Sequence, residues 1–234
     1  MPSSSNIFSF IQHLLGENKI INISGESGTG KTTLALQLVG NFFKDNLSAC
    51  CIWVQASELF PRKRLASMFR QSSDFLDYLK RKILVTPPNT TITNYSEQHR
   101  ILSNFTRLDP TLPPSLRYIV IDNISHHLRY EISKHSDIKV IISIIDKFYD
   151  YQLLPLIMFC QREGIYLILI HEVTYDLNSG RNRSFLFKLF DRLNTLKIRL
   201  SNQYNSQYKK LEISVSDQQW NFNYILHACG IVPL

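Results

Sequence analysis

Eight residues near the start of the chain have the types and spacing of a phosphate-binding loop. Residues 25–32, Gly-Glu-Ser-Gly-Thr-Gly-Lys-Thr, fit the pattern G-x-x-x-x-G-K-[ST] at every fixed position. Glycines let consecutive backbone N–H groups turn toward phosphate oxygens, and the start of the next helix adds positive potential. A lysine at this place reaches the β- and γ-phosphates, and the hydroxyl beside it binds magnesium. The expected nucleotide contacts are Gly25, Glu26, Ser27, Gly28, Thr29, Gly30, Lys31, Thr32 and Thr33.

The segments on both sides of this loop agree with that interpretation. The apolar run 20–24 predicts a strand before the loop, and residues 32–43 have the periodic apolar residues of an amphipathic helix after it. The alternative is a glycine turn that precedes a helix by chance. A strand and a helix that are both in register with the motif argue against that alternative.

An acidic residue at the end of an apolar strand supplies the second half of the expected site. Residues 117–121, Arg-Tyr-Ile-Val-Ile, lead directly into Asp122. A carboxylate placed there by a buried strand lies beside the water shell of a magnesium ion. We therefore expect ATP and Mg²⁺ as cofactors, with Thr32 and Asp122 on the metal side.

The pattern of apolar runs predicts an α/β fold. The earlier runs are short, almost continuously apolar and separated by helix-length segments, which is typical of parallel strands covered on both faces. The last two alternate between apolar and polar residues and predict an antiparallel pair at the C-terminal edge, extended by 220–225. The whole is a three-layer sandwich around a mostly parallel central sheet. The expected strands are 20–24, 49–54, 83–85, 118–121, 165–170, 196–200 and 211–215.

Composition narrows the class of protein further. A chain of 234 residues with 44% apolar residues is expected to form one globular domain with a real core, or at most one domain with a small appendage. Its proline-rich segment 86–114 is expected to be a connection inside that domain, with a helical middle. Apolar runs are too short to cross a membrane, and four scattered cysteines are expected to be buried reduced thiols. The net charge of +7 permits an anionic partner without identifying one.

The order of these motifs resembles the ATPase core of RecA-type recombinases, particularly the archaeal RadB proteins and the short eukaryotic recombinase paralogues. The resemblance rests on the glycine loop, on the segment 51–65 after the second strand, on 119–124 around Asp122, and on 168–173 with its pair His171-Glu172. It implies a RecA-like P-loop NTPase core over residues 19–234. Residues 1–18 are then an N-terminal segment that we expect to be available for docking to a partner.

Two departures from the family pattern bear on hydrolysis. The family's water-activating glutamate falls at Ser57, with Glu58 one step along, where an extended segment turns a side chain to the other face. A local bulge would restore it. The family's Asn-Gln phosphate sensor is replaced by His171-Glu172, and Glu172 is either a substitute base or an unhelpful charge. The candidate catalytic residues are therefore Lys31, Glu58 and Glu172, with weak DNA-dependent ATPase activity at most.

The resemblance also locates a candidate DNA-binding loop at residues 175–184. It contains Arg181 and Arg183 and is followed by basic residues interleaved with Phe185, Phe187 and Phe190, a composition that suits phosphate contacts and base stacking. The alternative is a helix over 185–193 that buries the phenylalanines.

Two other polar segments are expected to lie outside the site. The basic patch 62–64 with Arg70 is expected to be a solvated face or a subunit contact. The pair His126-His127 is expected to lie in an exposed loop, although a place near nucleotide or DNA is the alternative.

The resulting hypothesis is an ATP-binding recombinase paralogue that acts in DNA repair by homologous recombination. It would bind single-stranded or branched DNA and form a hetero-oligomer with a recombinase or its paralogues, in the nucleus or, for an archaeal host, the cytoplasm. A structural pseudo-ATPase subunit and a small-molecule P-loop kinase remain as alternatives.

Overall fold

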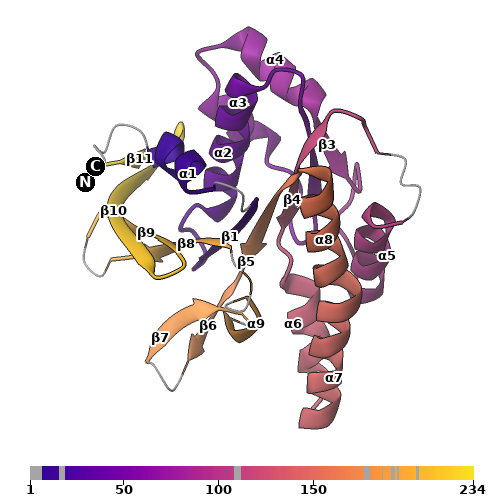
Figure 1. Cartoon of the computed structure of the whole chain (residues 1–234). Coiled ribbons are helices and arrows are strands. Elements are labelled where there is room, and N and C mark those ends of the chain that lie inside the picture. Colours follow the sequence, from indigo (N-terminus) through magenta and orange to yellow (C-terminus); the bar gives the residue numbers. More distant parts are fainter. Residues whose placement is uncertain are drawn as a thin grey trace.

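A computed structural model shows a nine-stranded sheet with helices on both faces (Figure 1). The structure describes residues 7–15, 19–107, 112–176, 180–185, 187–190, 193, 195–203 and 206–234. The strands are β1 (Ile20–Gly25), β2 (Cys50–Gln55), β3 (Ile83–Thr86), β4 (Leu116–Asp122), β5 (Tyr166–His171), β6 (Val173–Asp176), β7 (Arg181–Ser184), β8 (Leu196–Asn202), β9 (Lys209–Val215), β10 (Gln218–His227) and β11 (Gly230–Pro233). The helices are α1 (Ile7–Leu15), α2 (Lys31–Asp45), α3 (Arg62–Met68), α4 (Ser73–Lys82), α5 (Tyr95–Phe105), α6 (His126–Ser133), α7 (Ile138–Phe148), α8 (Leu154–Glu163) and α9 (Phe187–Phe190), with a π-helical turn at Tyr149–Leu153.

The central sheet has the order β11-β10-β9-β8-β1-β5-β4-β2-β3. Strands β3, β2, β4, β5, β1 and β8 run parallel, and β9, β10 and β11 continue the sheet as an antiparallel edge. The parallel strands β1 and β2 are buried at every position, which is why their sequences are almost continuously apolar. Both the parallel centre and the antiparallel C-terminal edge confirm the expected fold class.

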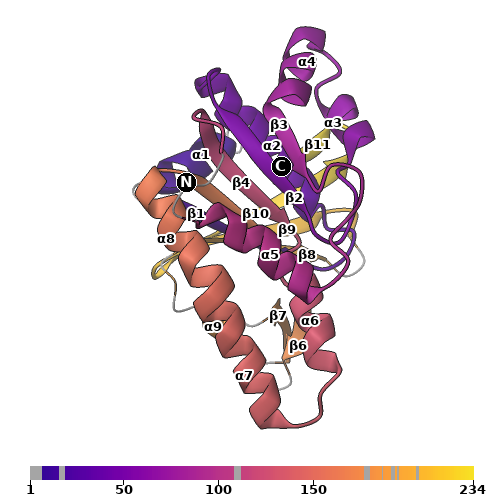
Figure 2. The same ribbon diagram turned by 90° about the vertical axis from the view of Figure 1, so that its right-hand side faces the viewer.

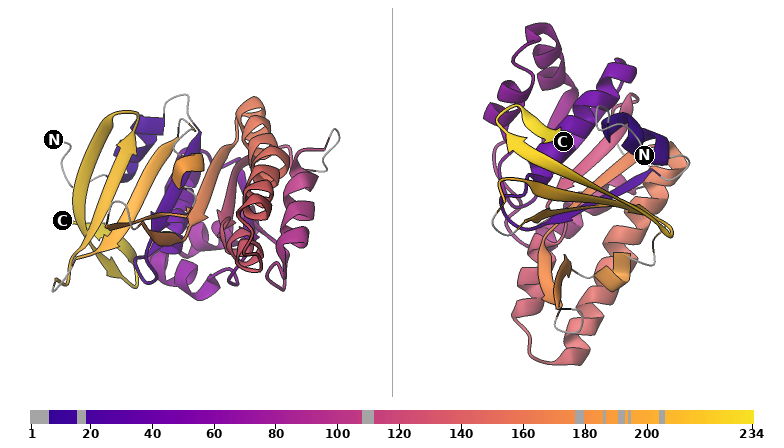
Figure 3. Two further views of the ribbon diagram at one scale, coloured as in Figure 1. Left: turned by 90° about the horizontal axis from the view of Figure 1, so that it is seen from below. Right: turned by 90° about the vertical axis from the view of Figure 1, so that its left-hand side faces the viewer.

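Two apolar clusters fill the spaces between the sheet and its helices. Helices α1, α2, α3 and α4 pack on one face around Trp53 and Phe43, and α5, α6 and α8 pack on the other around Ile121 and Leu169. The view in Figure 2 shows α5 and α8 in front of the parallel strands. Figure 3 shows the same layers from below and shows the C-terminal strands curling away beside α1.

Two connecting segments take regular structure. The connection 86–114 carries α5 in its middle, as expected, with the N-cap side chain of Asn94 accepting a hydrogen bond from the Glu97 N–H at 2.9 Å. The N-terminal segment carries α1, whose Ile7, Ile11 and Leu15 are buried in the core. Partner docking by residues 1–18 stays a prediction, since residues 1–6 and 16–18 lie outside the described part.

The segment expected to be a polar loop forms a two-stranded hairpin instead. Strands β6 and β7 pair antiparallel from Val173 opposite Ser184 to Asp176 opposite Arg181, and Gly180 closes the turn side with a left-handed φ of 62°. Most residues of the two strands are polar or charged, so the sequence lacks the apolar face that would mark a core strand and predicts no strand here. No helix among the described residues has the length and apolar character needed to span a membrane.

Candidate nucleotide site

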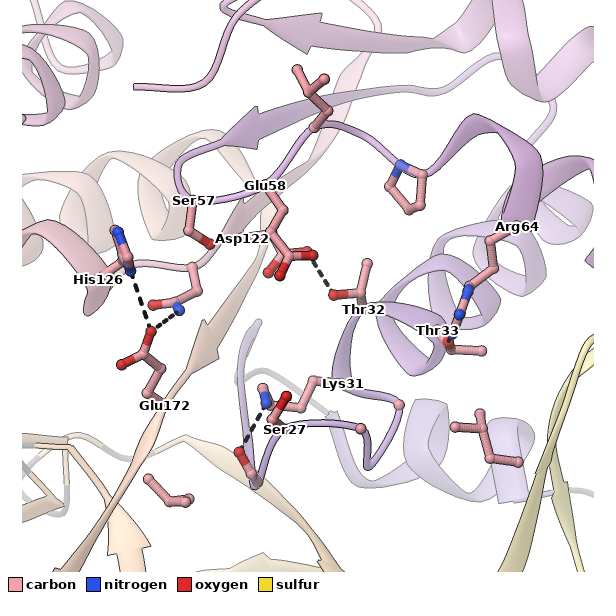
Figure 4. Close-up of a pocket in the computed structure, with 18 of the residues that line it drawn as sticks. Ser27, Lys31, Thr32, Thr33, Ser57, Glu58, Arg64, Asp122, His126 and Glu172 are labelled. Atoms are coloured by element: carbon pink, nitrogen blue, oxygen red, sulfur yellow. Dashed lines mark hydrogen bonds and ion pairs between the residues drawn. The ribbon is translucent and has the colours of Figure 1, made fainter. Parts of the chain in front are cut away.

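A cavity of about 670 Å³ opens at the carboxyl ends of β1, β2, β4 and β5 (Figure 4). The parallel strands bring together polar segments that are far apart in sequence, because all their carboxyl ends meet at one edge. The lining residues come from the glycine loop, the segments after β2, β4 and β5, and the C-terminal strands. They are Gly25, Ser27, Gly28, Gly30, Lys31, Thr32, Thr33, Ser57, Glu58, Leu59, Pro61, Arg64, Asp122, Asn123, His126, Arg129, Glu172, Val173 and Leu226.

The glycine loop has the backbone geometry that its sequence requires. Gly28 and Gly30 have left-handed φ values of 74° and 92°, and a Cβ atom on Gly25 would lie 2.5 Å from the Leu200 carbonyl oxygen. Lys31 Nζ donates hydrogen bonds to the carbonyl oxygens of Gly25 at 2.9 Å and of Glu26 at 3.0 Å. Burial lowers the pKa of Lys31, and nearby carboxylates oppose this effect. An anion that enters the cavity would therefore interact with a partly desolvated ammonium group.

Two of the expected contact residues turn their side chains elsewhere. The Glu26 carboxylate accepts hydrogen bonds from Asn182 and Asn202, and the Thr29 hydroxyl donates to the Glu26 carbonyl at 2.8 Å. Neither Glu26 nor Thr29 is among the residues that line the cavity. The Tyr224 hydroxyl on β10 donates a hydrogen bond to the Thr29 carbonyl of the loop at 2.6 Å. The sequence did not indicate this contact.

Thr32 and Asp122, the two residues expected to bind Mg²⁺, lie in contact with each other. The Thr32 hydroxyl donates to Asp122 Oδ2 at 2.7 Å. A hydroxyl and a carboxylate are hard oxygen donors that suit magnesium, which keeps several waters and completes its shell with phosphate oxygens. In the described part of the chain no group of three His, Cys, Asp or Glu side chains could hold a metal ion alone.

The buried carboxyl of Asp122 predicts a pH dependence of stability. Burial raises its pKa from 3.8 to about 6, with Glu58 adding to the rise while Thr32 and Lys31 oppose it. Between about pH 4 and 6 the folded chain binds more protons than the unfolded chain, so Asp122 lowers the free energy of unfolding as pH rises, by roughly 3 kcal/mol. In metal-free urea titrations, Asp122→Asn should remove this slope. A slope equal to that of the parent would contradict the assignment.

Glu58 reaches the cavity because the chain bends after β2. The strand ends at Gln55, and the N–H groups of Ala56 and Ser57 both donate to the Asp122 carbonyl, at 2.7 and 3.2 Å. The Gln55 side chain fixes the bend by accepting from the Phe60 N–H at 2.7 Å. Figure 4 shows the Glu58 side chain pointing into the cavity toward Thr32 and Asp122. Strand alternation does not apply here, since the segment is not extended.

Glu172 lies at the opposite wall and is held by three donors. Its carboxylate accepts from Asn123 at 2.9 Å and pairs with Arg129 at 3.1 Å and His126 at 3.3 Å. Burial alone raises its pKa, but the hydrogen bonds from Asn123, His126 and Arg129 outweigh burial, so the net pKa is lowered. A carboxylate stabilised in its ionised form is a weak proton acceptor, which favours Glu58 over Glu172 as the base.

Of the three histidines near the site, His126 lines the cavity, whereas His127 and His171 are buried. His126 lines the cavity at the start of α6, and the buried His127 shares a 2.9 Å hydrogen bond with the Ala56 carbonyl, so the expected exposed loop pair is wrong. His171 lies inside the sheet, with Nε2 3.1 Å from Asn22 Oδ1 and its ring 4.2 Å from Phe190. Burial lowers the pKa of His171 to about 3, so this imidazole is neutral and does not replace a phosphate sensor.

Arg64 lines the cavity, although the basic patch that contains it was expected to be a solvated face or a subunit contact. Its guanidinium donates to the Thr33 hydroxyl at 2.6 Å and lines the cavity. Arg62, Lys63 and Arg64 are all exposed, as expected for that patch. The sequence carries no local signal for which of the three contacts α2, so only the hydrogen bond to Thr33 reveals it.

The candidate DNA-binding arginines lie on the hairpin strand β7. Arg183 pairs with Asp176 at 3.2 Å and its guanidinium lies 4.5 Å from the Phe187 ring centre. The side chain of Arg181 lies outside the described part. Phe190 is buried, as the helical alternative for 185–193 expects, whereas Phe185 and Phe187 are half-buried.

Comparisons with known proteins give the family context. The chain is 28% identical over 169 residues to the DNA repair and recombination protein RadB of Thermococcus gammatolerans, covering 72% of this chain and 67% of that protein. It is 30% identical over 123 residues to the DNA repair protein RAD57 of Saccharomyces cerevisiae, covering half of this chain and 26% of RAD57. A crystal structure of the RadB recombinase matches the fold with a TM-score of 0.70, at 20% identity and 99% coverage of this chain. No protein-family model matches the sequence.

Proposed function

We propose that this chain is an ATP-binding recombinase paralogue of the RecA type that also binds DNA, because it is similar to proteins named for DNA repair and recombination and has the fold of the RadB recombinase. One observation carries the proposal. Lys31, Thr32 and Asp122 converge in a single cavity at the carboxyl edge of the sheet, with the Thr32–Asp122 hydrogen bond in place. Such an arrangement supplies a cation for phosphates and oxygen donors for Mg²⁺.

Different residues of the cavity are proposed to bind the phosphates and the nucleoside of ATP. Lys31, Thr32 and Asp122 are proposed to hold the β- and γ-phosphates with Mg²⁺, and Glu58 is proposed to orient or activate the attacking water. Arg64, Pro61 and Leu226 also line the cavity, and a cation and two apolar side chains suit the nucleoside.

We propose that the hairpin β6–β7 provides the DNA contact through Arg181 and Arg183. It follows Glu172 directly, so it extends from the wall of the cavity, and Figure 1 shows it projecting below the sheet beside α9. The preferred ligand is single-stranded or branched DNA. Partners are a recombinase or fellow paralogues in a hetero-oligomer, acting where the chromosome lies: the nucleus, or the cytoplasm of an archaeal host.

Fluorescence anisotropy of a labelled single-stranded oligonucleotide tests the DNA assignment. We expect binding that strengthens with Mg-ATP and weakens about tenfold when salt rises from about 50 to 200 mM, as for about two to three phosphate contacts. Arg183→Ala should weaken binding and lower the salt slope, because it removes one positive charge from the hairpin.

The matched control is Arg100→Ala, which removes an arginine that pairs with Glu97 at 3.6 Å on α5. It should bind DNA like the parent. If no condition gives binding, or if Arg100→Ala and Arg183→Ala weaken it equally, the hairpin is not the DNA-binding element.

A further inference from the structure

Glu26 is a residue of the phosphate loop whose side chain leaves the cavity. Its carboxylate accepts one hydrogen bond from Asn182 Nδ2 at 2.8 Å and another from Asn202 Nδ2 at 2.7 Å. Asn182 lies on β7 of the hairpin, and Asn202 ends β8 of the central sheet. One carboxylate therefore joins the phosphate loop, the hairpin and the sheet.

The backbone of Glu26 faces the opposite way. Its carbonyl oxygen accepts hydrogen bonds from Lys31 Nζ at 3.0 Å and from the Thr29 hydroxyl at 2.8 Å. The residue thus contacts the phosphate-binding lysine with its main chain and the hairpin with its side chain. A shift of Lys31 toward a phosphate changes the main-chain contacts of the same residue whose carboxylate holds the hairpin.

The hairpin depends on contacts of this kind for its position. It is a separate two-stranded sheet, and an isolated pair of strands is marginally stable on its own. Asn182 is held from two sides, because its side chain donates to Glu26 and its carbonyl accepts a hydrogen bond from the Arg199 guanidinium. The root of the hairpin is held separately, where the Phe185 N–H donates to the Glu172 carbonyl at 2.8 Å.

We propose that Glu26 is a positioning residue that couples nucleotide binding to the placement of hairpin β6–β7 through Asn182 and Asn202. The inference rests on the proposed nucleotide site and adds a connection from that site to the hairpin. Hydrogen bonds to an ionised carboxylate are stronger than neutral ones, and two donors converge on this group. Since coupling between two sites is reciprocal, a change on the hairpin alters nucleotide affinity, and nucleotide alters the hairpin.

The experiment measures both directions of the coupling. Affinity for a fluorescent ATP analogue with Mg²⁺ is compared in the parent, Asn182→Ala and Glu26→Gln. Asn182→Ala should weaken binding about 5- to 10-fold although Asn182 does not line the cavity. Glu26→Gln should act in the same direction, because one amide oxygen replaces two carboxylate oxygens and faces two donors.

Hydrogen exchange at the backbone amides of β6 and β7 provides the second readout. Mg-ATP should slow exchange there in the parent and in the control Thr174→Ala, which alters the same hairpin outside this contact. It should slow exchange little in Asn182→Ala. In the double variant Glu26→Gln/Asn182→Ala the loss of affinity should be less than the product of the two single losses, since both remove one interaction.

The outcomes separate this inference from the proposed function. If the parent binds the analogue and Asn182→Ala matches it in affinity and exchange, the coupling through Glu26 is wrong while the nucleotide site stands. If the parent itself does not bind the analogue, both are wrong. Thermal unfolding checks each fold, and Asn182→Asp, which keeps the side-chain shape but repels Glu26, replaces Asn182→Ala should that variant unfold.

Discussion

Replacing Lys31 by alanine should weaken binding of Mg-ATP about 100-fold. The ammonium group belongs to a residue that lines the cavity, where burial lowers its pKa and two loop carbonyls accept its hydrogen bonds. A phosphate that replaces those carbonyls gains charge-assisted hydrogen bonds worth roughly 3 kcal/mol in total, which corresponds to that factor. Titration with a fluorescent ATP analogue measures it directly.

Lys44→Ala is the matched control for this substitution. Lys44 is on the same helix, α2, but its ammonium lies at the far end, 5.9 Å from the Phe75 ring centre. Removing it changes net charge by the same amount without touching the cavity, so affinity should stay near that of the parent. Binding by Lys31→Ala at the affinity of the parent would show that the glycine loop is not the nucleotide site.

The elements of this fold that the sequence predicts are those with local signals. Buried parallel strands need apolar side chains on both faces, so β1, β2, β4 and β5 stand out as continuous apolar runs. Residues 25–32 are equally local, because the loop's function depends on consecutive backbone N–H groups. Asp122 follows from both signals together, since the strand that positions it is apolar and the loop requires an acid.

The residues that the sequence did not predict are placed by contacts between distant segments. Arg64 contacts α2 through its hydrogen bond to the Thr33 hydroxyl, and His126 at the cavity pairs with Glu172. The hairpin β6–β7 has no apolar face and is fixed by side-chain bonds to Glu26 and Arg199. None of these contacts leaves a period or a spacing in the sequence.

The same reasoning applies to Glu58 and Glu172, the two glutamates that the sequence offers as candidate bases. A glutamate one residue late is misdirected only on an extended strand, and the chain after Gln55 is bent by two hydrogen bonds to the Asp122 carbonyl. Glu172, at the place of the expected phosphate sensor, pairs with Arg129 and His126, and its net pKa is lowered. We therefore propose Glu58 as the base.

We accordingly expect slow ATP hydrolysis that depends on Glu58. Glu58→Gln should lower the turnover rate about 100-fold, the loss expected when a general base is removed, while affinity for ATP stays near that of the parent. The amide keeps the size and polarity of the side chain but accepts no proton. Phosphate release in single-turnover experiments, with and without single-stranded DNA, separates the chemical step from binding.

Glu172→Gln is the matched control, because it makes the same chemical change on the opposite wall of the same cavity. It should keep most of the turnover, since its carboxylate is already paired with cations and contributes no base. A rate lost in Glu172→Gln and retained in Glu58→Gln would reverse the assignment. A parent protein without measurable turnover would contradict the role given to Glu58 and favour a subunit in which bound ATP acts only on conformation and assembly.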